Sequence, residues 1–510
     1  MQGAFMRDER TPVIVGIGEI VDRPTVPSLG LEPLALMESA LRRAAEDAVG
    51  QEMAIRLLAA IDSLDVINLA SWRYDDPAGQ LCSRLGILPR RAEYGPLGGE
   101  SPVRLLHEAA LSIARGQQHI CAIVGAEARN TLVKARKMGI ELPWSPLSQS
   151  APRILRGEEI LRRQSVKLGV DQPTTVYPFY ETATAAHWGL SPREALKESA
   201  ELWASYSQVA EANPISWLKK KFNADAIGRA SPDNRMIAWP YTKLQVANPT
   251  VNQGGAVLIM SLARARAEGI SEDRIVHVLG GAKANEPRDY LDRDQYYRSH
   301  AQEAVLKAGQ AIAGDRGFGL MELYSCFPCV PKMALRSLGG AGKISPTVTG
   351  GLTFFGGPLN NYMTHAACSM VSRLRTDRGV GLLYGQGEFL TKHHSLVLST
   401  DRPKRPIACW DPSVQASADS QRCPVPKFVV RYTGRAALET STVIYGKDGQ
   451  IVHGVVILRC HDGSRTIARV PADDPQTLRS ICDPDRTPVG LEGTLLQGHD
   501  EVANWSVGSD

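Results

Sequence analysis

This sequence is poor in several features, and each absence excludes a class of protein. No apolar run reaches the roughly 20 residues that a membrane-spanning helix requires. The first residues, MQGAFMRDERTP, lack the apolar core of a secretory signal. The net charge is only +4 over 510 residues, which argues against a dedicated nucleic-acid-binding protein. We therefore expect a cytoplasmic protein that binds neither membranes nor nucleic acids.

Cysteine is scattered rather than arranged in pairs. The nine cysteines are an odd number in a long chain, which does not indicate a disulfide framework and fits a reducing compartment. Cys326 and Cys329 form a single CxxC pair with no second pair, so the sequence predicts no zinc site and no other metal.

The residues that are present are typical of a globular enzyme. Hydrophobic residues make up 43% of the chain and charged residues 22%, and a length of 510 residues suggests about three domains. After position 400 the chain consists of short β-type runs separated by Gly, Asp and Pro. One of these separators, Lys447-Asp448-Gly449, predicts a hairpin.

One local pattern occurs twice. An alanine-rich helix that contains His107 ends at a glycine, and a buried strand follows and ends at Gly125. The same order of helix and strand begins again at His365 and ends at Gly385. The repetition predicts two similar α/β halves, although an alanine-rich helix before a strand is also common by chance.

These patterns divide the chain into four parts. Residues 1–129 form the first half and residues 249–400 form the second. Residues 130–248 contain basic helices, proline turns and aromatic clusters, and we interpret them as an insertion over the core. Residues 405–510 are interpreted as a separate β-rich domain.

The segment Asn252-Gln253-Gly254-Gly255, followed by an apolar strand up to Ser261, resembles the Asn-Asp-Gly-Ala-Ala turn of thiolases. Residues 13–18 and the two halves extend the resemblance over about residues 10–400. The chain is similar to divergent thiolase-like proteins, related to acetyl-CoA acetyltransferases and to the sterol-carrier type, that carry an added C-terminal domain. The resemblance implies a duplicated five-layer αβαβα core, an inserted loop domain and a small C-terminal β-barrel-like domain. It also implies acetyl-CoA or CoA as a co-substrate, and a homodimer.

Three positions that are catalytic in thiolases have lost their usual residues. The nucleophilic Cys at the N-terminus of a buried helix, where the helix dipole lowers the thiol pKa, corresponds to Gly99. The His of the Gly-His-Pro motif corresponds to Gly357, and the Cys of the Cys-x-Gly motif corresponds to Tyr384 or Gly385. The usual thiolase mechanism therefore does not carry over.

One motif partly survives in Tyr324-Ser325-Cys326-Phe327, which resembles the Asn-Glu-Ala-Phe motif. In the family this position helps to hold an oxyanion, so the resemblance predicts that the Tyr324 hydroxyl donates to a thioester or enolate oxygen. Cys326 is either a relocated nucleophile or a buried apolar side chain.

Polar residues near the lost positions are candidates for substrate binding. Asn360 and Asn361 either bind a carbonyl group or cap a helix. Ser101 either contacts substrate or caps the helix ahead of Pro102.

Titratable residues in the second half are candidates for catalysis. His365 follows the altered Gly-Gly-Pro turn. Lys392 and His393 either bind a carboxylate and exchange protons or form a solvated strand edge. Tyr384 is a catalytic candidate as a partner of Tyr324.

Lys219, Lys220 and Lys221 lie in the insertion, where thiolases bind the phosphates of CoA. Three lysines suit phosphate electrostatically, but such a run is also typical of a solvated surface.

Three functions remain open at this point. The first is a CoA-dependent acyltransferase that acts on a β-keto acid or β-ketoacyl thioester as its small-molecule acyl substrate, without the thiolase Cys. The second is a thiolase-fold retro-aldol lyase acting on an acyl-CoA. The third is a non-catalytic acyl-CoA-binding protein.

Overall fold

The computed structural model describes residues 10–150, 157–340, 342, 344–498 and 502–508. Its core is a nine-stranded sheet in the order β3-β2-β4-β7-β1-β8-β11-β10-β9. The strands are β1 (Pro12–Val21), β2 (Ser63–Val66), β3 (Arg91–Tyr94), β4 (Ile120–Ala128), β7 (Asn252–Ser261), β8 (Val276–Asn285), β9 (Leu320–Leu323), β10 (Val380–Gly387) and β11 (Lys392–Ser399).

The sheet consists of two related halves. In the first half β2 and β4 are parallel, and β7 runs antiparallel between β4 and β1. In the second half β9 and β10 are parallel, and β11 runs antiparallel between β10 and β8. The halves meet where Val13 pairs with His277 and Ile14 with Val276. This topology confirms the predicted duplication.

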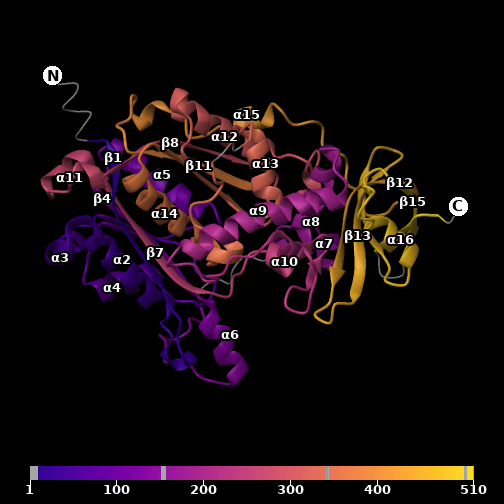
Figure 1. Ribbon diagram of the computed structural model, residues 1–510, viewed down its shortest axis with the longest axis horizontal. Coiled ribbons are helices and arrows are strands. Elements are labelled where there is room, and N and C mark those ends of the chain that lie inside the picture. The colour runs from indigo at the N-terminus through magenta and orange to yellow at the C-terminus, as the bar shows by residue number, and fades with distance from the viewer. Residues whose placement is uncertain (1–9, 151–156, 341, 343, 499–501, 509–510) are drawn as a thin grey trace.

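Two helices, α5 (Ser101–Ala114) and α14 (Tyr362–Asp377), form the central layer and pack against strands of both halves. Residues 362–371 of α14 are all buried, as expected for a helix without a solvent face. The outer layers are α2 (Pro33–Val49), α3 (Gln51–Ala59) and α4 (Pro77–Leu85) on one side, and α12 (His300–Ala313) and α13 (Cys329–Ser337) on the other. The expected thiolase-like α/β core is therefore confirmed (Figure 1).

The outer helix α2 lies unusually close to β1. A Cβ atom on Gly16 would lie 2.1 Å from the carbonyl oxygen of Ala44, and one on Gly18 would lie 2.0 Å from that of Ala40. Glycine at these two strand positions lets the backbones of helix and strand come into contact.

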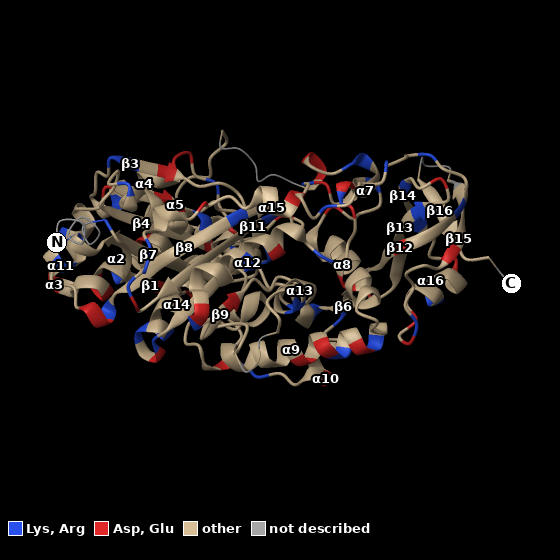
Figure 2. Ribbon diagram, turned by 90° about the horizontal axis from the view of Figure 1, so that it is seen from above, with Lys and Arg blue, Asp and Glu red and all other residues tan. Residues whose placement is uncertain are grey.

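The chain between β4 and β7 adds a group of helices and a short hairpin. One helix, α8, is buried from Val176 to Ala185 and lies between the core and the C-terminal domain (Figure 2). The elements are α6 (Arg129–Met138), α7 (Arg163–Lys167), α8 (Pro173–His187), α9 (Pro192–Ala212), α10 (Ala224–Gly228), β5 (Met236–Ala238) and β6 (Tyr241–Thr242), and α11 (Leu262–Ala267) follows β7.

The C-terminal region closes into a five-stranded barrel, as expected. Its strands pair in the ring β12-β13-β14-β16-β15, and β15 pairs back to β12. The barrel also receives the hairpin of the insertion, because Ala238 of β5 pairs with Ile444 of β12. The elements are α15 (Gln415–Asp419), β12 (Gly434–Tyr445), β13 (Ile451–Cys460), β14 (Arg465–Val470), α16 (Pro475–Ile481), β15 (Glu492–Gln497) and β16 (Ala503–Ser506).

A buried arginine fastens the barrel to the core. Arg465 on β14 is fully buried, and its Nε donates to Glu439 Oε2 at 2.7 Å. The rest of its guanidinium donates to three backbone carbonyls of the core, those of Leu291, Arg293 and Asp294. In the described parts of the chain, no helix is long and apolar enough to cross a membrane.

Replacing Arg465 by Met should loosen the barrel, because the buried carbonyls lose their donor and Glu439 loses one of its two arginine partners. Removing one partner of a buried ion pair costs about 3–5 kcal/mol, so the calorimetric transition that includes the barrel should move to lower temperature. Arg459 is the matched control, since it pairs with the same carboxylate but is 37% exposed. Arg459→Met should cost less than about 1 kcal/mol, and equal losses in both variants would contradict the assignment.

Candidate active site

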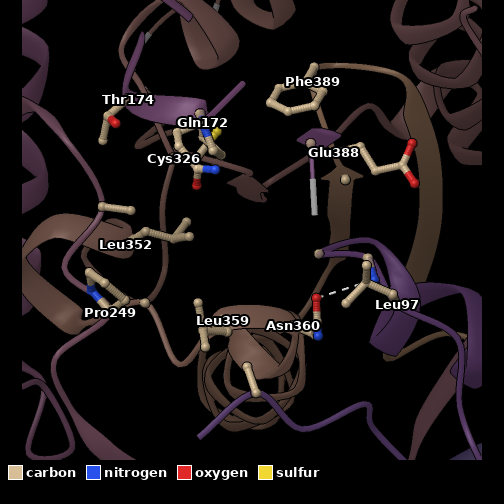
Figure 3. A pocket seen from close by; sticks show the side chains of 18 of the residues that line it. Leu97, Gln172, Thr174, Pro249, Cys326, Leu352, Leu359, Asn360, Glu388 and Phe389 are labelled. Atoms are coloured by element: carbon tan, nitrogen blue, oxygen red, sulfur yellow. Dashed lines mark hydrogen bonds between the residues drawn. The ribbon is translucent and has the colours of Figure 1, made fainter. Parts of the chain in front are cut away.

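A cavity of about 1140 Å³ lies between the two halves of the core and the insertion (Figure 3). We call its buried end the floor. The floor consists of Gly98 and Gly99 before α5, Tyr324 and Cys326 after β9, and Gln386 on β10. Both halves therefore contribute to a single site.

Gly99, at the position of the thiolase nucleophile, has no room for a side chain. A Cβ atom there would lie 2.3 Å from the Tyr324 hydroxyl oxygen and 2.5 Å from the Gln386 carbonyl oxygen. Burial raises the pKa of Tyr324 well above its ordinary value, so the phenol keeps its proton. No residue that the structure describes hydrogen-bonds to this hydroxyl group. The nucleophile position is therefore taken by a hydrogen-bond donor.

Gly357, at the position of the thiolase His, does have room for a side chain. A Cβ atom there would find its nearest neighbours, the carbonyl oxygens of Leu352 and Asn248, at 3.4 and 3.5 Å, which is ordinary van der Waals contact. The missing imidazole therefore leaves space in the cavity.

Glu100 lies directly behind the floor and is only 4% exposed. Its Oε2 has no hydrogen-bond partner. A Cβ atom on Gly98 would lie 2.2 Å from this oxygen, and one on Gly387 would lie 2.0 Å from it. Burial raises the pKa of Glu100 to about 7, although the charge of Lys392 opposes the shift. The sequence gives no signal for Glu100, because a glutamate before Ser-Pro is typical of any helix start.

Asn360 organises the floor from the second half of the chain. Its Oδ1 accepts the backbone N–H of Gly98 at 3.2 Å, and its Nδ2 donates to the Asn68 carbonyl at 3.0 Å (Figure 3). Asn361 points away from the cavity and donates to the Gly125 carbonyl at 2.8 Å. Asn360 therefore lines the cavity, whereas Asn361 joins the two halves.

Cys326 lines the floor but is held as a thiol. Gln386 Nε2 lies 3.0 Å from its Sγ. Burial raises the pKa of Cys326 to about 12, so very little thiolate exists at neutral pH. A thiol in this state is a poor nucleophile.

Tyr384 and His393 lie outside the cavity lining, in a separate buried network. The Tyr384 hydroxyl donates to His393 Nδ1 at 2.8 Å and accepts from Gln302 Nε2 at 3.0 Å, while His393 Nε2 donates to the Leu390 carbonyl at 3.1 Å. Burial lowers the pKa of His393 to about 4, so the imidazole is neutral. This network joins β10 and β11 to α12.

The remaining candidates also have partners away from the floor. His365 Nδ1 lies 2.7 Å from Glu19 Oε1 in the core. Lys392 donates to the Leu97 carbonyl at 3.0 Å and forms an ion pair with Glu388 at 2.9 Å. Leu97 and Glu388 line the cavity, and Lys392 does not. Lys392 therefore holds two lining residues in place without lining the cavity itself.

Ser101 is the first residue of α5, and its side chain caps no helix. Its hydroxyl group donates to the Pro96 carbonyl at 2.8 Å. The side chain supports the turn before α5 and does not line the cavity.

Charged side chains of both signs line the cavity, among them the carboxylates of Glu158 and Asp171. Arg73, Arg129 and Arg136 line it, and the exposed side chains of Arg129 and Arg136 form no ion pair with any described residue. The predicted phosphate-binding residues, Lys219, Lys220 and Lys221, are exposed and lie outside the cavity lining. The sequence of α6, RNTLVKARKM, contains four basic residues and no acidic one. This charge, directly after a core strand, is the sequence feature that indicates cationic side chains near the cavity.

Much of the cavity lining beyond the floor is apolar. Figure 3 shows Pro249, Leu352 and Leu359 around one side of the cavity, with Phe389 and Glu388 across from them.

Comparisons with known proteins agree with this architecture. The family model described as the thiolase-like protein type 1 additional C-terminal domain matches residues 414–499. A monomeric SCP2-thiolase-like protein type 1 from Mycobacterium smegmatis is 28% identical, with a TM-score of 0.81 over 98% of this chain and 100% of that chain. No curated protein matches the chain in sequence.

More distant structures share the core alone. An acetyl-CoA acetyltransferase from Syntrophomonas wolfei is 15% identical, with a TM-score of 0.54 over 77% of this chain and 99% of that chain. The Ltp2-ChsH2(DUF35) aldolase is 15% identical, with a TM-score of 0.56 over 78% of this chain and 100% of that chain. The duplicated core, the matched C-terminal domain and the full-length similarity support a divergent thiolase-like protein with an additional C-terminal domain.

Proposed function

We propose that the chain is a carbon–carbon lyase that cleaves a β-hydroxyacyl thioester of CoA by a retro-aldol reaction. The observation that carries the proposal is the Tyr324 hydroxyl group in the volume next to Gly99. A retro-aldol cleavage needs a proton acceptor and a donor to the enolate oxygen, but it needs no nucleophile. The cavity floor offers a donor where thiolases have their nucleophile, which favours this chemistry.

Acyl transfer, the other reaction expected from the resemblance, is less well supported. Its covalent route, through an acyl-enzyme, needs a nucleophilic side chain, and Gly99 has none. The remaining thiol in the lining, Cys326, keeps its proton because burial raises its pKa to about 12. An aldolase with the same fold supports the lyase by analogy of fold alone.

Two exposed arginines of the cavity lining support binding of the CoA moiety. The diphosphate and ribose phosphate of CoA carry negative charges that Arg129 and Arg136 complement at the cavity mouth. The apolar wall then leads the thioester arm toward Tyr324. In this arrangement Tyr324 donates its O–H to the thioester oxygen as negative charge develops there.

Replacing Tyr324 by Phe should remove the enolate donor and lower the rate of cleavage by about 10²–10³-fold. The readout is α-proton exchange of acetyl-CoA in D₂O by NMR, because it reports enolate formation for any acyl partner, together with cleavage of a panel of β-hydroxyacyl-CoA thioesters.

Tyr384→Phe is the matched control, because it removes the same chemical group from the network behind the sheet. It should lower thermal stability and retain most of the exchange rate. Cys326→Ala should also retain exchange. A large loss in Cys326→Ala with an unchanged rate in Tyr324→Phe would instead indicate a thiol mechanism.

The double variant Arg129→Ala, Arg136→Ala should weaken CoA binding by about tenfold or more, since each charge-assisted contact contributes about 1.5–3 kcal/mol. Isothermal titration calorimetry at two salt concentrations measures this loss. The triple variant Lys219→Ala, Lys220→Ala, Lys221→Ala removes more charge from the same insertion and should change affinity less than about twofold. The reverse ranking would place the phosphates on the lysines.

A further inference from the structure

We infer that Glu100 is the proton acceptor of this cavity, which takes the β-hydroxyl proton during cleavage and returns it to the α-carbon of the product. The inference rests on the proposed function and adds the group that the lyase chemistry still lacks.

The position of Glu100 carries the inference. Its carboxyl group lies at the N-terminal end of α5, one residue after Gly99, and its Oε2 is buried without a hydrogen-bond partner. Gly98 and Gly387, which line the cavity, lie directly beside this oxygen, since a Cβ atom on either would come within 2.2 Å of it. Any side chain at either position would collide with the carboxylate. In the proposed reaction, a change of the Glu100 side-chain rotamer or one bridging water connects this carboxylate to a ligand bound against Gly98 and Gly387.

Cys326, Tyr177, Tyr324 and Glu388 of the lining are unsuited to this role. Burial holds the protons on Cys326, Tyr177 and Tyr324, because it raises the pKa of each. Burial also acts to raise the pKa of Glu388, but the ion pairs with Arg288 and Lys392 outweigh it and lower that pKa below its ordinary value. Glu388 is thus a weak base with two cationic partners.

No histidine belongs to the lining of the cavity among the residues that the structure describes. Three buried histidines of the second half have partners elsewhere: His365 with Glu19, His393 with Tyr384, and His394 with His107. A site in this fold that performs proton transfer without an imidazole needs another group with a pKa near neutrality.

The electrostatic setting of Glu100 suits a group that both accepts and returns a proton. Burial raises its pKa to about 7, while the nearby charge of Lys392 and the N-terminal dipole of α5 stabilise the carboxylate. A carboxyl group balanced in this way exchanges protons at physiological pH.

The reaction balances without any further reagent. The Glu100 carboxylate takes the proton of the β-hydroxyl group, the β-oxygen forms a C=O double bond, and the bond between the α- and β-carbons breaks. The electron pair of that bond becomes the enolate of the shortened acyl-CoA, and the Tyr324 O–H stabilises the enolate oxygen. The protonated Glu100 then donates to the α-carbon, which releases an aldehyde or ketone and an acyl-CoA.

The test compares Glu100→Gln with the wild type in acetyl-CoA α-proton exchange across pH 5 to 9. Wild-type exchange should rise with pH through a midpoint near 7, because the carboxylate is the active form. Glu100→Gln should lower the exchange rate by about 10²–10⁴-fold. The pH dependence with a midpoint near 7 should disappear, while the affinity for CoA stays unchanged. Glu100→Asp keeps a carboxyl group and should retain a titration at reduced rate. Glu108→Gln, on the same helix but paired with Arg104 on the surface, should behave as wild type.

Thermal stability gives a readout that does not depend on turnover. A carboxyl group with a raised pKa stabilises the fold most below its unfolded pKa, and this stabilisation is lost as pH rises through about 7. Glu100→Gln removes the cost of ionisation, so its melting temperature should exceed that of the wild type at pH 8 and approach it at pH 5.

The outcomes separate the two proposals. Wild-type exchange that persists in Glu100→Gln overturns the role of Glu100 and leaves the lyase proposal standing. CoA binding without exchange or cleavage in the wild type overturns both. Loss of exchange in Glu100→Gln with folding and CoA binding preserved supports both.

Discussion

The cavity floor depends on one steric constraint, which is that the phenol of Tyr324 and a side chain on residue 99 cannot occupy the same volume. With the phenol present, residue 99 is a glycine and the start of α5 carries no nucleophile. The backbone of residues 98–99 can then pack closely against β10, and the carboxyl group of Glu100 fits behind it. The Tyr324 side chain on the loop after β9 thus excludes a nucleophilic side chain at position 99, where the two halves meet.

Much of the fold could be predicted from the sequence, because buried helices and strands leave a periodic pattern of apolar residues. The repeated order of alanine-rich helix and apolar strand at His107 and His365 predicted the two halves, and the turn-rich tail predicted the barrel. These signals are local, so they survive without knowledge of tertiary contacts. Tyr324 was identified differently, through the resemblance of its motif to the Asn-Glu-Ala-Phe motif of thiolases.

The rest of the site depends on which face a side chain occupies and on what surrounds it. Tyr384 and His393 have the residue types of an active site, but strand alternation directs them to the network with Gln302. Glu100 looks like an ordinary helix start because burial, which raises its pKa, leaves no trace in the sequence. Lys219–Lys221 and the arginines of α6 have the same charge, and tertiary packing alone decides which set lies at the cavity.

The barrel and the insertion are structurally dependent on each other. Thr440 of β12 donates to the Phe179 carbonyl of α8 at 2.6 Å, and Thr182 of α8 donates to the Ser441 carbonyl at 3.1 Å. The hairpin of β5 and β6 extends the barrel sheet at β12, and α8 in turn supplies part of the cavity wall. Neither segment is therefore a portable module. A lineage that lost the tail would leave a strand edge unpaired and a helix unsupported, so the two segments are expected to be gained, kept and lost together in evolution.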